Sequence, residues 1–208
     1  MIRSRVVDTA PRFCTAGWRP TRTTILVSAI DTLDRSTTRT DRWLLGAAAF
    51  FTVAVLVHNS DHVRRGADAV TKDVFWVGTS SIALEIGLVV LATQRHRLAA
   101  LAATAGGFAL AAGYLLVHFL PERGWLSDSF TSATNVSPLS WFAASLEVTA
   151  AITLGVVGLF VLRERGGLAS ATQAKANQLS TRAALLHPIA LAMIAGNAAI
   201  LVASFAQL

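Results

Sequence analysis

The sequence of 208 residues has one cysteine, Cys14, and few charged residues for its length. A lone cysteine cannot form an intramolecular disulfide, and it lacks the C-x-x-C spacing of a thiol metal site or redox motif. Charged residues make up 14% of the chain, against about 25% in a typical soluble domain. This composition excludes an ordinary soluble domain.

Familiar catalytic motifs are also absent. The sequence has no phosphate-cradling glycine loop, Rossmann fingerprint, nucleophile elbow or kinase signature. Residues 1–42 lack the apolar run of about 7–15 residues and the small-residue cleavage site of a secretory signal. We expect them to form an Arg-rich cytosolic extension that is partly disordered.

Long apolar runs take the place of these motifs. Residues 43–60, 98–121 and 183–208 carry no formal charge, while 74–94 and 129–162 carry a single carboxylate each. Each run is about the length of roughly 20 residues that crosses a hydrocarbon core. Because backbone groups cannot stay unpaired in lipid, such spans are helical. The sequence therefore predicts an all-α, polytopic membrane bundle of five transmembrane helices, at 43–60, 75–93, 98–120, 140–162 and 183–206.

The basic residues predict the orientation of this bundle. Arg and Lys outside the spans lie mostly before the first span, between the second and third, and between the fourth and fifth. Cytoplasmic segments carry such an excess, so we expect a cytoplasmic N-terminus and an extracytoplasmic C-terminus in the plasma membrane. Topology then explains the net charge of +6, and we expect no nucleic-acid partner. The expected partners are the lipid bilayer and, through small-residue helix faces, a second copy or another membrane protein.

Histidines gather at the predicted outer ends of two spans. His58, Asp61 and His62 close the first span, and His118 closes the third. If the first helix continues one more turn, the i, i+3, i+4 spacing places the first three on one face. Two imidazoles one turn apart are a familiar pair for Zn²⁺ or another divalent transition metal. We predict a metal site formed by His58, His62, His118 and Asp128.

Carboxylates inside the spans supply the remaining candidates. A buried Glu in a membrane costs several kcal/mol unless it is protonated, paired or facing water, so Glu85 and Glu147 each indicate a functional site. Glu147 lies at a depth where it can meet His58, and we predict Asp61 and Glu147 as catalytic residues. Tyr114, Ser127 and Glu85 complete the predicted pocket. The alternative is structural: histidines hydrogen-bonded at helix ends, and protonated carboxyls bonding across helices.

Three functional hypotheses follow from these residues. The first is an outward-facing metal pocket that hydrolyses or modifies a lipid-linked or extracytoplasmic substrate. The second is a proton- or cation-coupled transporter of small solutes, since ionisable groups in bundles often mark a path. The third is a membrane scaffold or assembly subunit without catalysis. Haem ligation by His58 and His118 is a further variant.

Overall fold

The structure, a computed structural model, describes residues 22–66, 69–122, 124–166, 185 and 187–206, with side chains from residue 39 onward. The chain divides into two units, 1–37 and 38–208, which are described separately. The described residues contain helices and no strand. In chain order the helices are α1 (Arg22–Arg65), α2 (Lys72–Thr93), α3 (Ala99–Tyr114), a π-helical turn η2 (Leu115–Phe119), α4 (Pro138–Glu164) and α7 (Pro188–Phe205).

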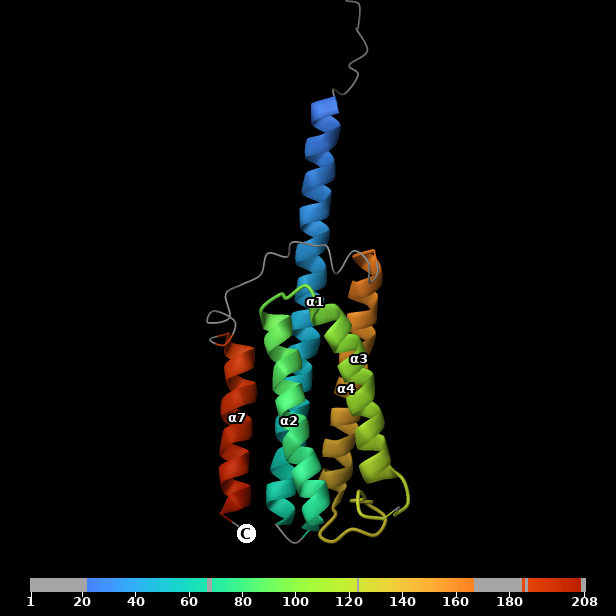
Figure 1. The fold of residues 1–208 in the computed structure, drawn as a ribbon, viewed down its shortest axis with the longest axis vertical. Coiled ribbons are helices and arrows are strands. Elements are labelled where there is room, and N and C mark those ends of the chain that lie inside the picture. The colour runs from blue at the N-terminus through green and yellow to red at the C-terminus, as the bar shows by residue number, and fades with distance from the viewer. Residues whose placement is uncertain (1–21, 67–68, 123, 167–184, 186, 207–208) are drawn as a thin grey trace, which may run out of the picture. The chain divides into compact units, whose positions relative to one another are not determined.

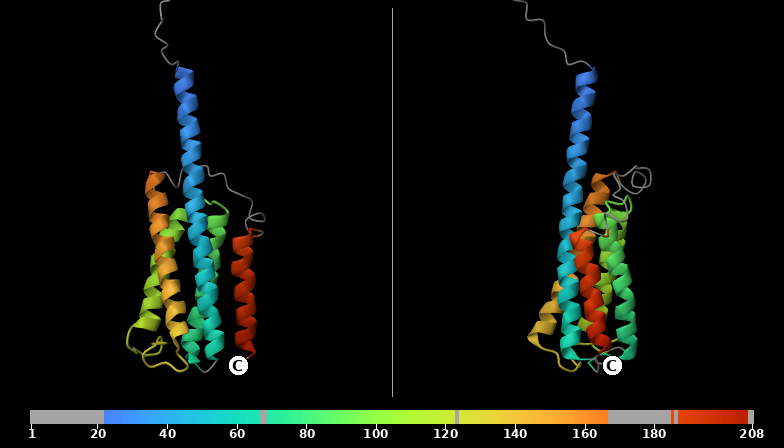
Figure 2. Two further views of the ribbon diagram at one scale, coloured as in Figure 1. Left: turned by 180° about the vertical axis from the view of Figure 1, so that it is seen from behind. Right: turned by 90° about the vertical axis from the view of Figure 1, so that its left-hand side faces the viewer.

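Five helical segments are long and apolar enough to cross a membrane, which confirms the predicted membrane bundle. They are Arg39–Arg65, Lys72–Thr93, Ala99–Phe119, Pro138–Glu164 and Pro188–Phe205. The helices of the second unit run alongside one another (Figures 1 and 2). Their orientation in the bilayer stays a prediction.

Three helices begin where a polar residue caps them, and these starts differ from the limits of the apolar runs. Thr71 accepts a hydrogen bond from the backbone N–H of Val74, so α2 begins at Lys72, before the predicted residue 75. Ser137 and Ser140 form a reciprocal cap at the start of α4, two residues before the predicted boundary. His187 caps α7, and Pro188 takes its first position. Hydropathy detects the lipid-crossing portion of a helix, whereas polar caps determine where the helix starts.

The predicted extension and connector are described only in part. Helix α1 already begins at Arg22, so residues 22–42 of the predicted extension are helical. Residues 1–21, on which the expected disorder partly falls, lie outside the described residues. The same holds for 167–184, which include most of the polar connector and the first two residues of the predicted fifth span.

Helix α1 continues past the predicted end of its span, to Arg65. Gly66 stops it with a φ of 93°, a left-handed conformation that favours glycine at a helix C-terminus. The Gly66 N–H bonds the carbonyl of His62 at 3.2 Å. From the loop before α4, the Asn135 side chain donates to the Arg65 carbonyl at 3.1 Å. Because α1 continues to Arg65, His58, Asp61 and His62 all lie on the helix, where the i, i+3, i+4 spacing places them on one face.

Small residues bring α3 and α4 into close contact. A Cβ added to Gly107 would lie 2.6 Å from the backbone nitrogen of Gly155, and one added to Gly158 would lie 2.7 Å from that of Thr104. The backbones of α3 and α4 therefore approach closely at these glycines, as small residues allow. Helix α7 is joined to α1 by a polar contact, because the Asn59 side chain donates to Asn197 Oδ1 at 2.8 Å.

Replacing Gly107 with alanine should destabilise the bundle by about 1–3 kcal/mol, since the added methyl has to displace backbone. The matched control is Gly46→Ala on α1, where an added Cβ meets nothing within 4 Å. We expect the control to unfold at or above the wild-type temperature, because alanine favours helix. Thermal unfolding in detergent, followed by circular dichroism, measures both variants, and equal melting temperatures would contradict the close packing.

Candidate metal centre

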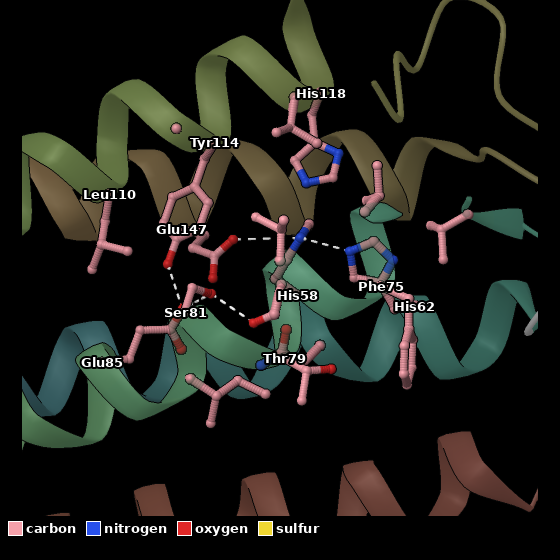
Figure 3. A pocket seen from close by; sticks show the side chains of 18 of the residues that line it. His58, His62, Phe75, Thr79, Ser81, Glu85, Leu110, Tyr114, His118 and Glu147 are labelled. Atoms are coloured by element: carbon pink, nitrogen blue, oxygen red, sulfur yellow. Dashed lines mark hydrogen bonds and ion pairs between the residues drawn. The ribbon is translucent and has the colours of Figure 1, made fainter. Parts of the chain in front are cut away.

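Three histidines from two chain segments converge at one end of the bundle. His58 and His62 lie one turn apart on α1, and His118 comes from η2 (Figure 3). Each offers a ligand nitrogen, and the three atoms lie within 4.8 Å of one another. The ring centroid of His118 is 4.8 Å from that of His58 and 5.6 Å from that of His62. Three of the four predicted ligands are thereby brought together.

The π-helical turn places His118 in this cluster. Residues Leu115–Phe119 form a wider turn than an α-helix, so side chains after Tyr114 point in directions that α-helical spacing would not give. Such turns in helices occur frequently at functional sites. The His118 ring is buried, with 4% of its surface exposed. Hydrophobic periodicity carries no signal for such a turn.

One distance in the cluster fits a tetrahedral metal. His58 Nε2 lies 3.0 Å from His62 Nε2, which suits one N–H···N hydrogen bond. It is also close to the roughly 3.3 Å between two nitrogens that bind one tetrahedral zinc at about 2.0–2.1 Å. Glu147 Oε2 lies 3.4 Å from His58 Nε2, an ion-pair distance. It has no hydrogen-bond partner among the described residues although it is buried, so it is available to a ligand.

A buried ion pair between Arg65 and Asp128 contacts His118. Arg65 donates to both carboxylate oxygens of Asp128, at 2.6 and 2.7 Å, and neither side chain has more than 1% of its surface exposed. His118 Nδ1 lies 3.3 Å from Asp128 Oδ2. Burial by itself raises the pKa of the Asp128 carboxyl, but hydrogen bonds and positive charge from Arg65 and contact with His118 bring that pKa below its usual value. A carboxylate behind a histidine commonly fixes the ring nitrogen that faces a metal.

Two of the other predicted site residues, Asp61 and Ser127, lie outside the cavity that adjoins the cluster. Asp61 is buried beside the cluster, where its Oδ1 accepts from Arg64 Nε at 2.7 Å. Ser127 Oγ is buried without a hydrogen-bond partner in the described part of the chain. Neither belongs to the described residues that line the adjoining cavity. His187 lies outside the cluster, where it caps α7.

Glu85 and Tyr114 lie beside the cluster and share a hydrogen bond. Tyr114 donates to Glu85 Oε1 at 2.8 Å, and Ser81 donates to the same oxygen at 2.9 Å. The Tyr114 ring centroid is 6.4 Å from that of His58. These side chains, the three histidines and Glu147 line one cavity of about 220 Å³ (Figure 3). The arrangement combines metal ligands, a carboxylate and room for a ligand.

Changing Arg65 to methionine should destabilise the protein by about 3–5 kcal/mol, because it leaves the Asp128 carboxylate buried and unpaired. The double variant Arg65→Met with Asp128→Leu should lose much less, since an apolar pair can replace a buried ion pair. A double-mutant cycle on thermal or denaturant unfolding measures the coupling. Additive losses would show that the two side chains do not support each other.

Comparison of the chain with protein-family models, with curated proteins and with solved structures finds no match. Function is therefore inferred from the site itself. That site is a cluster of three histidines beside a buried carboxylate oxygen that has no hydrogen-bond partner among the described residues, at the wall of a cavity within a membrane bundle.

Proposed function

We propose that the protein is a membrane metalloenzyme in which His58, His62 and His118 bind a divalent transition metal, Zn²⁺ in the first instance, for hydrolysis. The convergence of three imidazoles within 4.8 Å carries this proposal. Three protein ligands with a fourth position open to water or substrate are the usual arrangement of catalytic zinc. The cavity that the same histidines line offers room for that fourth ligand.

Glu147 is the residue we assign as general base. Its Oε2 lies 3.4 Å from His58 Nε2 and has no hydrogen-bond partner within the described ranges. When bound, a Zn²⁺ ion lowers the pKa of a coordinated water to about 7 and polarises a carbonyl. A carboxylate beside that position can accept the proton and later return it to the leaving group.

Asp128 and Asp61 take supporting roles in this proposal. Both oxygens of Asp128 accept from Arg65, so we assign it to orienting His118 in place of direct ligation. Asp61 accepts from Arg64, which also donates to Ser140 Oγ at 3.0 Å. We assign this pair to fixing the end of α1 against the start of α4. Of the two carboxylates that the sequence indicates as catalytic, Glu147 is the one at the cavity.

The surroundings favour hydrolysis over transport and haem binding. Beyond Glu85, the buried side chains described in the spans include no ionisable group and are mostly apolar, among them Phe51, Val55, Leu88, Val89 and Leu154. A transport path through that layer has no ionisable group to follow. The rings of His58 and His118 have centroids 4.8 Å apart and an interplanar angle of 69°. The ligand nitrogen of His62 lies within 4.8 Å of theirs. This geometry suits one small ion better than a porphyrin plane between two axial ligands.

The expected orientation places the cluster in the outer leaflet of the plasma membrane. A substrate would then be lipid-linked or extracytoplasmic, and its polar group would meet the histidines while apolar parts stay among the helices. A scaffold subunit is the competing function. It needs no metal, so metal content separates the two.

Protein purified in detergent should contain about one divalent transition metal per chain, measured by elemental analysis. His62→Ala should weaken metal binding by more than the roughly 10- to 100-fold that loss of an outer partner costs. His96→Ala is the matched control, because His96 lies in the turn between α2 and α3. Wild-type protein without metal after reconstitution with Zn²⁺ would overturn the proposal, and a Soret band would replace it with haem binding.

Glu147→Gln should retain the metal and lose hydrolysis. With p-nitrophenyl dodecanoate as the probe ester, we expect release of p-nitrophenolate to fall by about 10²–10⁴-fold, the usual contribution of a general base. Glu164→Gln, at the far end of the same helix, is the control and should keep full activity. Equal rates in wild type and Glu147→Gln would remove Glu147 from the chemistry.

A further inference from the structure

The cavity beside the histidines continues along the transmembrane helices. Its apolar wall comes from α2, α3 and α7 and includes Val74, Ile82, Leu110, Ile200 and Leu201. Three further lining residues, Val77, Gly78 and Ala109, also lie on the exposed surface of the spans. The cavity therefore reaches the surface that faces lipid. At about 220 Å³ it exceeds the roughly 150 Å³ that holds a benzene molecule.

Glu85 is a polar group inside this apolar wall. Its side chain is buried, with 2% of its surface exposed. Oε1 accepts from both Tyr114 and Ser81. Oε2 is buried and has no hydrogen-bond partner among the described residues, although Glu85 lines the cavity. An unpaired buried oxygen is costly, so a ligand group that bonds it would recover that cost.

We propose that Glu85 is a second polar anchor, and that the cavity takes a single-chain amphiphile with a hydroxyl or amide group near its reacting bond. A hydroxyl can donate to a carboxylate or accept from a carboxyl, and an amide offers both kinds of atom as well. Tyr114 joins this anchor to the histidine cluster, because it bonds Glu85 and its ring lies 6.4 Å from that of His58. That the amphiphile is a substrate of the enzyme rests on the proposed function.

Entry from the bilayer follows from the surroundings of the cavity. Val77 on α2 is 48% exposed, and Ala109 on α3 is also exposed. A Cβ added to Gly78 or to Gly113, both of which line the cavity, meets nothing within 4 Å. The opening is thus bordered by small or apolar residues, which an acyl chain can pass without desolvating a polar group. The chain would lie in the apolar part, with its polar group toward Glu85 and the histidines.

Photolabelling in phosphatidylcholine nanodiscs tests this inference. The probe is N-dodecanoylethanolamine with a diazirine on its acyl chain, and the matched probe is a hydrocarbon of the same length with the same diazirine. We expect adducts of the first probe on Val74, Leu110 or Ile200 above those on Val53 and Val156, two exposed control residues outside the cavity. Glu85→Leu should lower labelling by the first probe about fivefold, the effect of one lost hydrogen bond, and leave the hydrocarbon probe unchanged.

A second variant tests the cavity independently of Glu85. Gly113→Leu places a side chain in open space at the cavity wall and should lower labelling by both probes. Gly46→Leu, which also enters open space but outside the cavity, should lower neither. Labelling that is equal on cavity and control residues, or unchanged by Glu85→Leu, would overturn the inference.

The same samples separate this inference from the metal proposal. Elemental analysis reports on the metal, and labelling is repeated after EDTA treatment. Protein without metal that still shows Glu85-dependent labelling would contradict the metalloenzyme and support the amphiphile site. Protein that contains metal but shows no preferential labelling would contradict the amphiphile site and leave the metal centre standing.

Discussion

The pairing of Arg65 with Asp128 is the interaction on which the site depends. A guanidinium and a carboxylate that are both almost fully buried carry a large desolvation penalty, which their two short hydrogen bonds offset only while both partners are in place. The pair joins the last residue of α1 to the loop that follows η2. Through its contact with Asp128, His118 is held at the same junction. One ion pair thus couples the closing of a loop to the position of a histidine.

The polar groups of the site gather in one part of the bundle. The histidines, Glu147, Tyr114 and Glu85 gather toward the end where α1 stops, and they adjoin a core cluster of alanine, leucine, valine and phenylalanine against which Tyr114 packs. In an apolar surrounding, each buried ionisable group is tolerable only beside others that can pair with it. Gathering them in one place limits the cost, and it also concentrates their chemistry beside one cavity.

Unequal packing of the helices explains why that cavity lies on one side. Gly107 and Gly158 let α3 and α4 approach until their backbones are nearly in contact. In α7, by contrast, Ala190, Met193 and Asn197 are the buried residues, and Asn197 is held by a hydrogen bond from Asn59. Tight packing at one face and sparse packing at the other leave space between α2, α3 and α7. The same contrast leaves Gly78 and Gly113 at the cavity wall open to substitution, whereas Gly107 and Gly158 between α3 and α4 are closed to it.

The amino-acid sequence by itself determined the class of the protein and identified the candidate site residues. Charge-free runs of about twenty residues predict spanning helices because unpaired backbone cannot stay in lipid, and an ionisable side chain within such a run is conspicuous because it is costly. His58 and His62 could be paired from their spacing alone, once their helix continues. Tertiary structure decided the rest. The π-helical turn that directs His118, the capture of Asp128 by Arg65 and the separation of Asp61 from the cavity depend on contacts between segments far apart in the chain. No local periodicity records such contacts, because they arise only when the helices pack.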